Sequence, residues 1–588
     1  MKTIFPMLAF AATVATATPS DFHAWAPTPP MGWNSWDCFG TTVTEAQTKA
    51  QAGFMAAKLK AHGWTYVVVD IQWYEPEAKS HAYRDGAALT MDGFGRLTPA
   101  LNRFPSAAGG AGFKPLADHV HALGLKFGVH LMRGIPRQAV ERNLPILGTS
   151  LHAQDIASRT DICGWNPDMF GVDTTKPGAQ EYYDSVFALL ASWGVDYVKV
   201  DDISRPYFDH DREIEAVRRA IDRTGRPIVL SLSPGETDLQ AADHAGRHAN
   251  LWRISDDFWD RWLALRDQFP RLAAWNAHRR PGAWPDADML PLGVLNLGER
   301  ATRFTPDEQR TMLTLWSIAR SPLMHGGDMT KTDDATFALL TNDEVLAVNQ
   351  HSANNRPLFD RDDLIAWTAD VPNSPDKYLA VFNVRDRVRL TPENARYVSG
   401  PVTAQPATAA RVEADVTGGT KLFLVVTPLE PAGEWNRILW REPRLVFADG
   451  TERPLTDLKW TQADASWDST AVKKDTDGRT LGLAAEVPAV VAYALPAGAV
   501  RFTATGVAVD NGRGREPGPV RFMVVVATKE NEAVAAGLPV AVSLADLGFA
   551  GGARIRDLWT HRDLGAVSGE FAPEIPFHGA GLYRLSPR

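Results

Sequence analysis

Carboxylate side chains recur directly after short apolar segments in the first 330 residues. Asp70 follows the sequence YVVV, Asp201 follows YVKV, and Asp257 follows WRISD. An apolar run of this kind predicts a buried β-strand, so each carboxylate is expected at or just beyond the carboxyl end of a strand. Cleavage of a glycosidic bond needs two carboxylates, one that stays ionised and one that keeps a proton for the departing oxygen. The pattern therefore indicates glycosidic acid/base chemistry.

Asp201 and Asp257 are the pair best suited to these two roles. Lys199 lies two residues before Asp201, and side chains two apart on a strand share a face, so its ammonium favours an ionised Asp201. Asp257 lies between Trp252 and Trp259, and an apolar setting favours a protonated carboxyl. Each aspartate alone could instead cap the helix after its strand, as aspartate commonly does. The set together favours a catalytic site.

A repeated local pattern between residues 29 and 330 predicts the elements that position these groups. An amphipathic segment ends in glycine, and an apolar strand begins three residues later. A glycine just past a helix adopts the left-handed conformation at little cost, so each is a predicted helix C-cap. The four glycines are Gly63, Gly124, Gly194 and Gly225.

Eight such strands, one of them predicted over Asp288–Leu292, suit an α/β fold of the (β/α)₈ TIM-barrel type, in which catalytic groups sit at the carboxyl ends of the strands. A doubly wound open sheet is the alternative. It is disfavoured because no glycine-rich phosphate turn follows the first strand.

Five motifs resemble glycoside hydrolase family 27, the α-galactosidase (melibiase) family, in order from residue 29 to about 350. The resemblance implies a (β/α)₈ barrel with a C-terminal antiparallel β domain. It also implies a retaining double displacement, with Asp201 as nucleophile and Asp257 as acid/base. The motifs are PMGWNSW at 30–36, VD ending at Asp70, YVKVD ending at Asp201, WR followed by Asp257, and WPDADML at 284–290.

The resemblance further implies which side chains hold the sugar. His130 stands where a tyrosine is usual in the family, and Ser233 stands where a glutamate or serine is found. Asp288 belongs to the last of the five motifs. The remaining implied sugar-binding residues are Trp36, Asp70, Lys199 and Arg253.

Ile71 is a departure from the family pattern, because galactosidases of the family usually carry a second acid at this position. That acid is expected to bind a hydroxyl near C4–C6 of the sugar. β-L-Arabinopyranose has the ring stereochemistry of α-D-galactose without the hydroxymethyl arm, and family members that act on it resemble this chain in carrying an apolar residue here. We expect dual activity that leans towards the arabinopyranoside, since an apolar contact rejects an added hydroxyl by only about a hundredfold. The alternative is that Ile71 merely packs and another residue binds O6.

No cofactor and no metal are expected. A metal-dependent hydrolase using Asp70, His130, Asp201 and His325 is an alternative class, but Lys199 and Arg253 would repel a cation there. The histidine pairs His119/His121 and His244/His248 lie in predicted helices away from the barrel mouth. Cys38 and Cys163 are expected to be free thiols, because the position that the resemblance implies for a disulfide partner of Cys163 holds Ile203.

Alternating strands replace helical periodicity after about residue 355, which predicts all-β domains. By resemblance, the barrel covers 27–354, and the C-terminal antiparallel β domain is split into 355–409 and 530–588. The segment between, 410–529, resembles a carbohydrate-binding module, a β-sandwich found appended to such enzymes. A sandwich that only buttresses the barrel is the alternative.

The composition bounds the location and partners of the 588-residue chain. Residues 1–17 combine Lys2, an apolar run and the small-residue site Ala15-Thr-Ala17, which is typical of a secretory signal peptide. A secreted or periplasmic protein is therefore expected. The net charge of −9 argues against a nucleic-acid partner, and no basic amphipathic helix points to a membrane.

The expected partner is an oligosaccharide or polysaccharide with terminal α-D-galactose or β-L-arabinopyranose. An ordinary α-galactosidase and a non-catalytic sugar-binding protein are the alternative functions.

Overall fold

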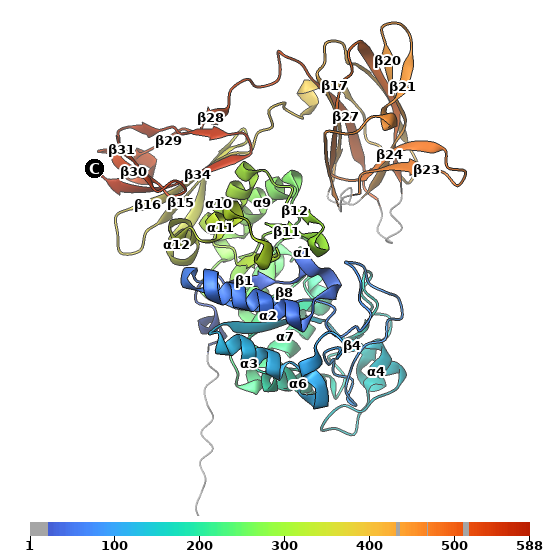
Figure 1. Cartoon of the computed structure of the whole chain (residues 1–588), viewed down its shortest axis with the longest axis vertical. Coiled ribbons are helices and arrows are strands. Elements are labelled where there is room, and N and C mark those ends of the chain that lie inside the picture. Colours follow the sequence, from blue (N-terminus) through green and yellow to red (C-terminus); the bar gives the residue numbers. More distant parts are fainter. Residues whose placement is uncertain (1–20, 431–435, 467–468, 510–516) are drawn as a thin grey trace, which may run out of the picture.

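The computed structural model describes residues 21–430, 436–466, 469–509 and 517–588, so the predicted signal peptide at 1–17 lies outside the described residues. The described chain forms a barrel, an antiparallel sheet packed on the barrel, and a β-sandwich joined to that sheet (Figure 1). None of the described helices combines the length and the apolar composition needed to cross a lipid bilayer.

Eight parallel strands form the barrel, as predicted. Neighbouring strands follow the order β10-β9-β8-β7-β3-β2-β1-β13, and Leu290 pairs with His325, which brings the two ends of the sheet together. The strands are β1 (Met31–Asn34), β2 (Tyr66–Val69), β3 (Lys126–Met132), β7 (Tyr197–Asp201), β8 (Val229–Leu232), β9 (Leu251–Arg253), β10 (Trp284–Asp286) and β13 (Leu323–His325).

The seventh strand differs from the prediction over Asp288–Leu292, which is wrong. β10 ends at Asp286, and Asp288 takes a left-handed backbone (φ 81°) that interrupts the extended run. Beyond it the Leu290 amide donates to the Met324 carbonyl at 2.8 Å in an isolated bridge to β13. The apolar run therefore closes the barrel without forming a strand.

Helices alternate with the strands. Thr44 and Gln47 form a capping box at the start of α2, each side chain accepting from the other residue's backbone N–H. All four predicted cap glycines have positive φ, between 67° and 95°. The helices of seven or more residues are α2 (Glu45–Phe54), α3 (Lys114–Ala122), α6 (Ala179–Ser192), α7 (Tyr207–Thr224), α8 (Ala242–His248), α9 (Trp262–Trp275), α10 (Pro306–Ala319), α11 (Asp334–Leu340) and α12 (Asp343–His351). The shorter ones are α1 (Trp36–Phe39), α4 (Arg137–Glu141) and α5 (Ala153–Ile156).

A six-stranded antiparallel sheet follows the barrel and is built from two distant parts of the chain. Its central pair runs from Lys377 opposite Leu585 to Asn383 opposite Gly579. The sheet lies against α10, which contacts mainly the strand nearest the C-terminus, Gly579–Pro587. In spatial order the strands are β14 (Ala353–Arg361), β15 (Leu364–Asp370), β16 (Lys377–Asn383), β34 (Gly579–Pro587), β30 (Ala553–Asp557) and β31 (Arg562–Val567).

The chain between these parts forms a two-sheet sandwich around a core that includes Trp440, Phe502 and Phe522. β17 belongs to this sandwich because it pairs with β27, although the predicted boundary at 410 places it in the split domain. One sheet holds β17 (Ala395–Val398), β27 (Val520–Ala527), β19 (Lys421–Pro428), β25 (Ala489–Ala494) and β22 (Gln462–Ala465). The other holds β18 (Ala409–Asp415), β26 (Ala499–Val509), β20 (Arg437–Phe447), β24 (Thr480–Glu486) and β23 (Ala471–Lys474), with β21 (Glu452–Pro454) beside β20.

The sandwich contacts the barrel through a buried carboxylate. Asp464 of β22 accepts from the Leu263 amide at 2.8 Å and lies 3.5 Å from the guanidinium of Arg261. Both partners lie at the start of α9, directly after the loop that carries Asp257. The sandwich is therefore anchored next to the catalytic edge of the barrel.

Gly32 of β1 packs so tightly that a side chain has no space. A Cβ placed there would lie 2.5 Å from the Tyr66 carbonyl oxygen of the adjacent strand. We expect Gly32→Ala to destabilise the barrel by about 1–3 kcal/mol, since the two strands must separate. Gly53→Ala is the control: a Cβ there meets nothing within 4 Å, and alanine favours a helix by roughly 0.5–1 kcal/mol. In thermal unfolding, the transition temperature should fall for Gly32→Ala but not for Gly53→Ala. Equal transition temperatures for the two variants would contradict this packing.

Candidate active site

A cavity of about 1820 Å³ opens at the carboxyl ends of the barrel strands. Its volume exceeds the roughly 300–1,000 Å³ of an ordinary small-molecule site, so it has room for more than one sugar. Six of the ten predicted site residues line it, and the remaining four, His130, Ser233, Arg253 and Asp288, lie behind or beside them. The six are Trp36, Asp70, Ile71, Lys199, Asp201 and Asp257.

Asp201, the last residue of β7, is held through one carboxylate oxygen. Its Oδ2 lies 2.9 Å from His130 Nε2 and 4.0 Å from Lys199 Nζ. Its Oδ1 is buried and has no hydrogen-bond partner among the described residues. Burial alone would raise the pKa of this carboxyl, but the Lys199 charge and the His130 hydrogen bond lower it below its usual range. Asp201 therefore presents an ionised carboxylate at the cavity wall.

Asp70, directly after β2, is fully buried and shares the ammonium of Lys199. Its Oδ2 accepts from Asn34 Nδ2 at 2.7 Å and lies 3.1 Å from Lys199 Nζ. Its Oδ1 accepts from the Ile71 amide at 2.9 Å. Burial disfavours the charged form of Lys199, but Asp70 and Asp201 outweigh burial and raise the pKa of the ammonium. Lys199 thus remains charged between two carboxylates.

Arg253, the last residue of β9, joins two acids on the opposite side. Its Nη2 lies 2.7 Å from Asp288 Oδ2 and 3.4 Å from Asp257 Oδ1. The same Asp288 oxygen accepts from the Phe258 amide at 2.7 Å. Asp288 therefore fixes both the guanidinium and the backbone beside Asp257.

Asp257 differs from Asp201 in its electrostatic balance. Burial raises the pKa of its carboxyl to about 7, and the carboxylates of Asp256, Asp288 and Asp201 add to that rise against the opposing Arg253. The side chain is still 33% exposed, so it is accessible from the cavity. At mildly acidic pH one cavity thus contains an ionised and a protonated carboxyl.

Ile71 and Ser233 complete the predicted set. Ile71 lines the cavity next to Asp70 with an apolar side chain that is 1% exposed. Ser233 directly follows β8, its carbonyl accepts from the Ile203 amide at 3.2 Å, and its buried hydroxyl has no hydrogen-bond partner among the described residues.

Aromatic side chains from two loops extend the cavity wall beyond the predicted residues. Trp36 stacks on Tyr83 with ring centroids 6.1 Å apart, and Tyr83 lies 5.3 Å from Trp165. Tyr83 and Trp165 come from connections without periodicity, so no strand end marked them. The abundance of tryptophan, 19 residues, was the only available signal.

Arg133 is another cavity residue that the sequence reasoning missed. It directly follows β3 and lies 2.7 Å from Asp161, 2.8 Å from Asp202 and 3.2 Å from Glu213. Its Nε also donates to the Asp202 carbonyl at 2.7 Å, which fixes the backbone after Asp201. Its place at a strand end could have identified it.

The sandwich also contributes to the cavity wall. Asn436, one residue before β20, lines the cavity and is 1% exposed. Its Nδ2 donates to the Gly518 carbonyl, which fixes the side chain within the sandwich. No sequence pattern linked residue 436 to a site in the barrel.

The two cysteines are both buried free thiols, as predicted. Cys163 lies beside Asp202, and burial together with that carboxylate raises the pKa of the thiol. Neither thiol is therefore activated for nucleophilic chemistry.

The metal-dependent alternative needs His325, which lies on β13, is 1% exposed and is not among the residues that line the cavity. Asp70 and Asp201, the carboxylates of that alternative, already share Lys199.

Comparisons with known proteins agree with this geometry. The family model described as alpha galactosidase A matches residues 146–351, and that of the alpha galactosidase C-terminal beta sandwich domain matches 522–585. An alpha-galactosidase from Cyamopsis tetragonoloba is 30% identical over 62% of this chain and 74% of its own. An alpha-galactosidase from Coffea arabica is 32% identical over 55% of this chain and 70% of its own. A family 27 β-L-arabinopyranosidase from Geobacillus stearothermophilus, solved with arabinose, is 40% identical over 97% of this chain and 99% of that chain, with a TM-score of 0.69.

A barrel with paired carboxylates at its mouth and these relatives define a glycoside hydrolase. The chain belongs to glycoside hydrolase family 27, and it is of the α-galactosidase or arabinopyranosidase type.

Proposed function

We propose that this enzyme is a retaining exo-glycosidase for terminal residues of α-D-galactose configuration, with a preference for β-L-arabinopyranosides. The observation that carries the proposal is that Asp201, beside Lys199 and His130, and Asp257, beside Arg253, line one cavity with pKa values shifted in opposite directions. Two carboxyls kept in different states are what a double displacement requires.

In the first step, the Asp201 carboxylate attacks the anomeric carbon while Asp257 donates its proton to the glycosidic oxygen. The bond between the anomeric carbon and that oxygen breaks, and its electron pair leaves with the oxygen as a neutral alcohol. The sugar is then held as an ester on Asp201. His130 and Lys199 contact Oδ2, which fixes the orientation of the carboxylate.

In the second step, Asp257 acts as the base. The ionised carboxylate accepts a proton from water, the water oxygen attacks the anomeric carbon, and the ester bond breaks to restore the Asp201 carboxylate. Two inversions leave the configuration of the anomeric carbon unchanged. A pKa of about 7 suits Asp257 to both steps.

Removal of the nucleophile tests the assignment of Asp201. We expect Asp201→Gly to lower kcat by roughly 10³-fold or more, since the covalent route closes. Added azide should restore turnover and give a glycosyl azide of inverted configuration, because azide takes the place of the carboxylate and no second displacement follows. NMR of the product checks the anomer.

Asp256→Gly, which removes a neighbouring cavity carboxylate, is the matched control and should not respond to azide. Absence of a glycosyl azide from the Asp201 variant, or a product of retained configuration, would show that Asp201 is not the nucleophile.

The pH dependence tests the role of Asp257. A proton donor with a pKa of about 7 is active below that pH, so kcat/KM for an alkyl glycoside should fall as the pH rises through about 7. The acidic limb should lie low, because the pKa of Asp201 is depressed. A dinitrophenyl glycoside, whose leaving group needs no proton, should lose the alkaline limb.

Asp286 provides the control, because burial and the charge of Asp288 raise its pKa to about 7 as well. Asp286→Asn should keep the alkaline limb. If kcat/KM for the dinitrophenyl glycoside falls at alkaline pH as it does for the alkyl glycoside, the fall does not come from the loss of the Asp257 proton.

Ile71 supports the preference for arabinopyranosides. Its apolar side chain stands in the cavity wall beside Asp70, where an acid would bind the C6 hydroxyl of galactose. A galactoside bound here must leave that hydroxyl without this partner, whereas an arabinopyranoside has no such group. An arabinopyranosidase of 40% identity is consistent with this preference.

Rates on p-nitrophenyl α-D-galactopyranoside and β-L-arabinopyranoside test the preference. We expect the wild type to favour the arabinopyranoside, and Ile71→Asp to raise the galactoside/arabinopyranoside ratio of kcat/KM by about ten- to a hundredfold. Ile71→Leu is the apolar control, and Ile71→Asn tests the same point without a buried charge. If the wild type strongly prefers the galactoside and neither polar variant changes the ratio, the enzyme is an ordinary α-galactosidase. No turnover of either substrate would favour a sugar-binding protein.

The proposal extends to the aglycone and to location. The volume of the cavity and the presence of Asn436 in its wall support an oligosaccharide or polysaccharide substrate, with the sandwich acting on the acceptor side. The resemblance of the sandwich to a carbohydrate-binding module further suggests that the sandwich itself binds sugar. The signal-like residues 1–17 support export, and they lie outside the described residues.

A further inference from the structure

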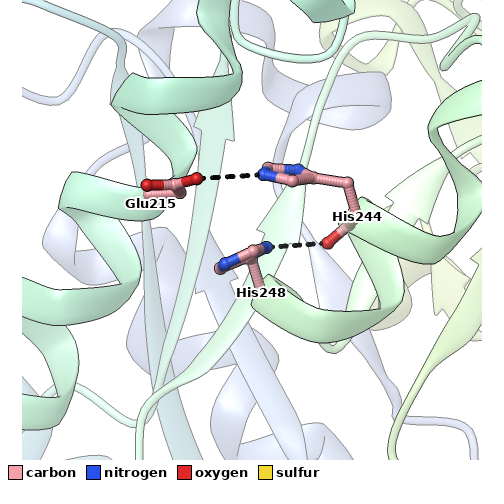
Figure 2. Close-up of side chains that lie close together, drawn as sticks. All are labelled: Glu215, His244 and His248. Atoms are coloured by element: carbon pink, nitrogen blue, oxygen red, sulfur yellow. Dashed lines mark hydrogen bonds and ion pairs between the residues drawn. The ribbon is translucent and has the colours of Figure 1, made fainter.

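Glu215 of α7 and the pair His244 and His248 of α8 gather on the outer helix layer, and none of the three lines the catalytic cavity (Figure 2). One potential ligand atom from each lies within 4.8 Å of the other two. The three side chains are only half-buried, so an ion can reach them from solvent. Residues four apart on a helix share a face, which brings both imidazoles opposite the carboxylate.

The hydrogen bonds orient both imidazoles for ligation. Nδ1 of His248 lies 2.8 Å from the His244 carbonyl and donates to it (Figure 2). Nδ1 of His244 lies 2.9 Å from the Tyr207 hydroxyl, which can accept its proton. Nε2 of His248 is then left with its lone pair, and Nε2 of His244 lies 3.4 Å from Glu215 Oε1, a contact that a bound ion would replace. Metal-bound histidines commonly have their other ring nitrogen bonded to oxygen in this way.

Arg219 limits the strength of the site. It lies 3.1 Å from Glu215 Oε2, whereas Glu215 Oε1 is the oxygen nearest to His244 Nε2, at 3.4 Å. One carboxylate oxygen is therefore paired and the other faces the histidines. The guanidinium opposes a cation by charge repulsion, so a moderate affinity is expected.

We propose that Glu215, His244 and His248 bind a divalent transition-metal ion of the Zn²⁺ class, with water as the fourth ligand. Bonds of about 2.0–2.1 Å in a tetrahedron place ligand atoms roughly 3.4 Å apart, so side-chain rotations must draw these atoms together. The ion would tie α7 to α8. It would also fix the hydroxyl of Tyr207, which lines the catalytic cavity.

Titration of the metal-free full chain with Zn²⁺ in a calorimeter tests the site. We expect one saturable site per chain, a rise in Tm on saturation, and no comparable rise with Mg²⁺. His248→Gln and Glu215→Gln should each weaken binding by at least about tenfold, because a ligand is lost. Tyr207→Phe, which keeps all three ligands, should weaken binding less than either ligand variant does, as expected for an outer partner.

His119→Gln, an exposed histidine on α3, is the matched control and should bind as the wild type does. Co²⁺ gives an independent readout, since four-coordinate cobalt has visible bands that should disappear in His248→Gln. The proposal is overturned if Zn²⁺ does not bind with saturation, or if binding survives unchanged in both ligand variants. In that case the Glu215–His244 pair serves only to pack the two helices.

Discussion

Two buried cations hold four of the acids at the mouth of the barrel. Lys199 lies between Asp70 and Asp201, and Arg253 lies between Asp257 and Asp288. A buried carboxyl is held ionised by a nearby cation and held protonated by burial and by nearby carboxylates. Asp37 shows the second effect: burial and the surrounding acids, Asp288 foremost, raise the pKa of its carboxyl well above the usual range. Asp257 also shows it, because burial and three neighbouring carboxylates outweigh Arg253, whereas Lys199 and His130 outweigh burial at Asp201.

The barrel supplies the reacting groups, and the neighbouring units control the space around them. Asp464 anchors the sandwich at the start of α9, and Asn436 reaches the cavity. On the other side, Arg556 forms a two-pronged contact with Glu344 of α12, which holds the C-terminal sheet on the barrel. Part of the cavity wall can therefore change in the sandwich while the barrel strands stay the same.

The sequence was most informative where chemistry coincides with periodicity. The barrel, its glycine caps and the carboxylates at strand ends follow from local patterns, because a buried strand and the residue that ends it are both visible in the chain. Tyr83, Trp165 and Asn436 could not be found in this way, since tertiary contacts alone bring their loops to the cavity. The apolar run at 288–292 was misread because a left-handed Asp288, which sequence does not reveal, interrupts it. The edge strand β17 was missed because it is short and half-exposed.

The pairing of β16 with β34 has a consequence for biosynthesis. Asn383 and Gly579 face each other, so the ribosome must make roughly two hundred residues before the partner strand exists. At ~5–20 residues per second, β16 waits about 10–40 s with one edge unpaired. An unpaired strand edge is a template for association with other chains. The sandwich core comes entirely from residues made during this interval. It can therefore fold first, which shortens the distance between β16 and the later strand β34.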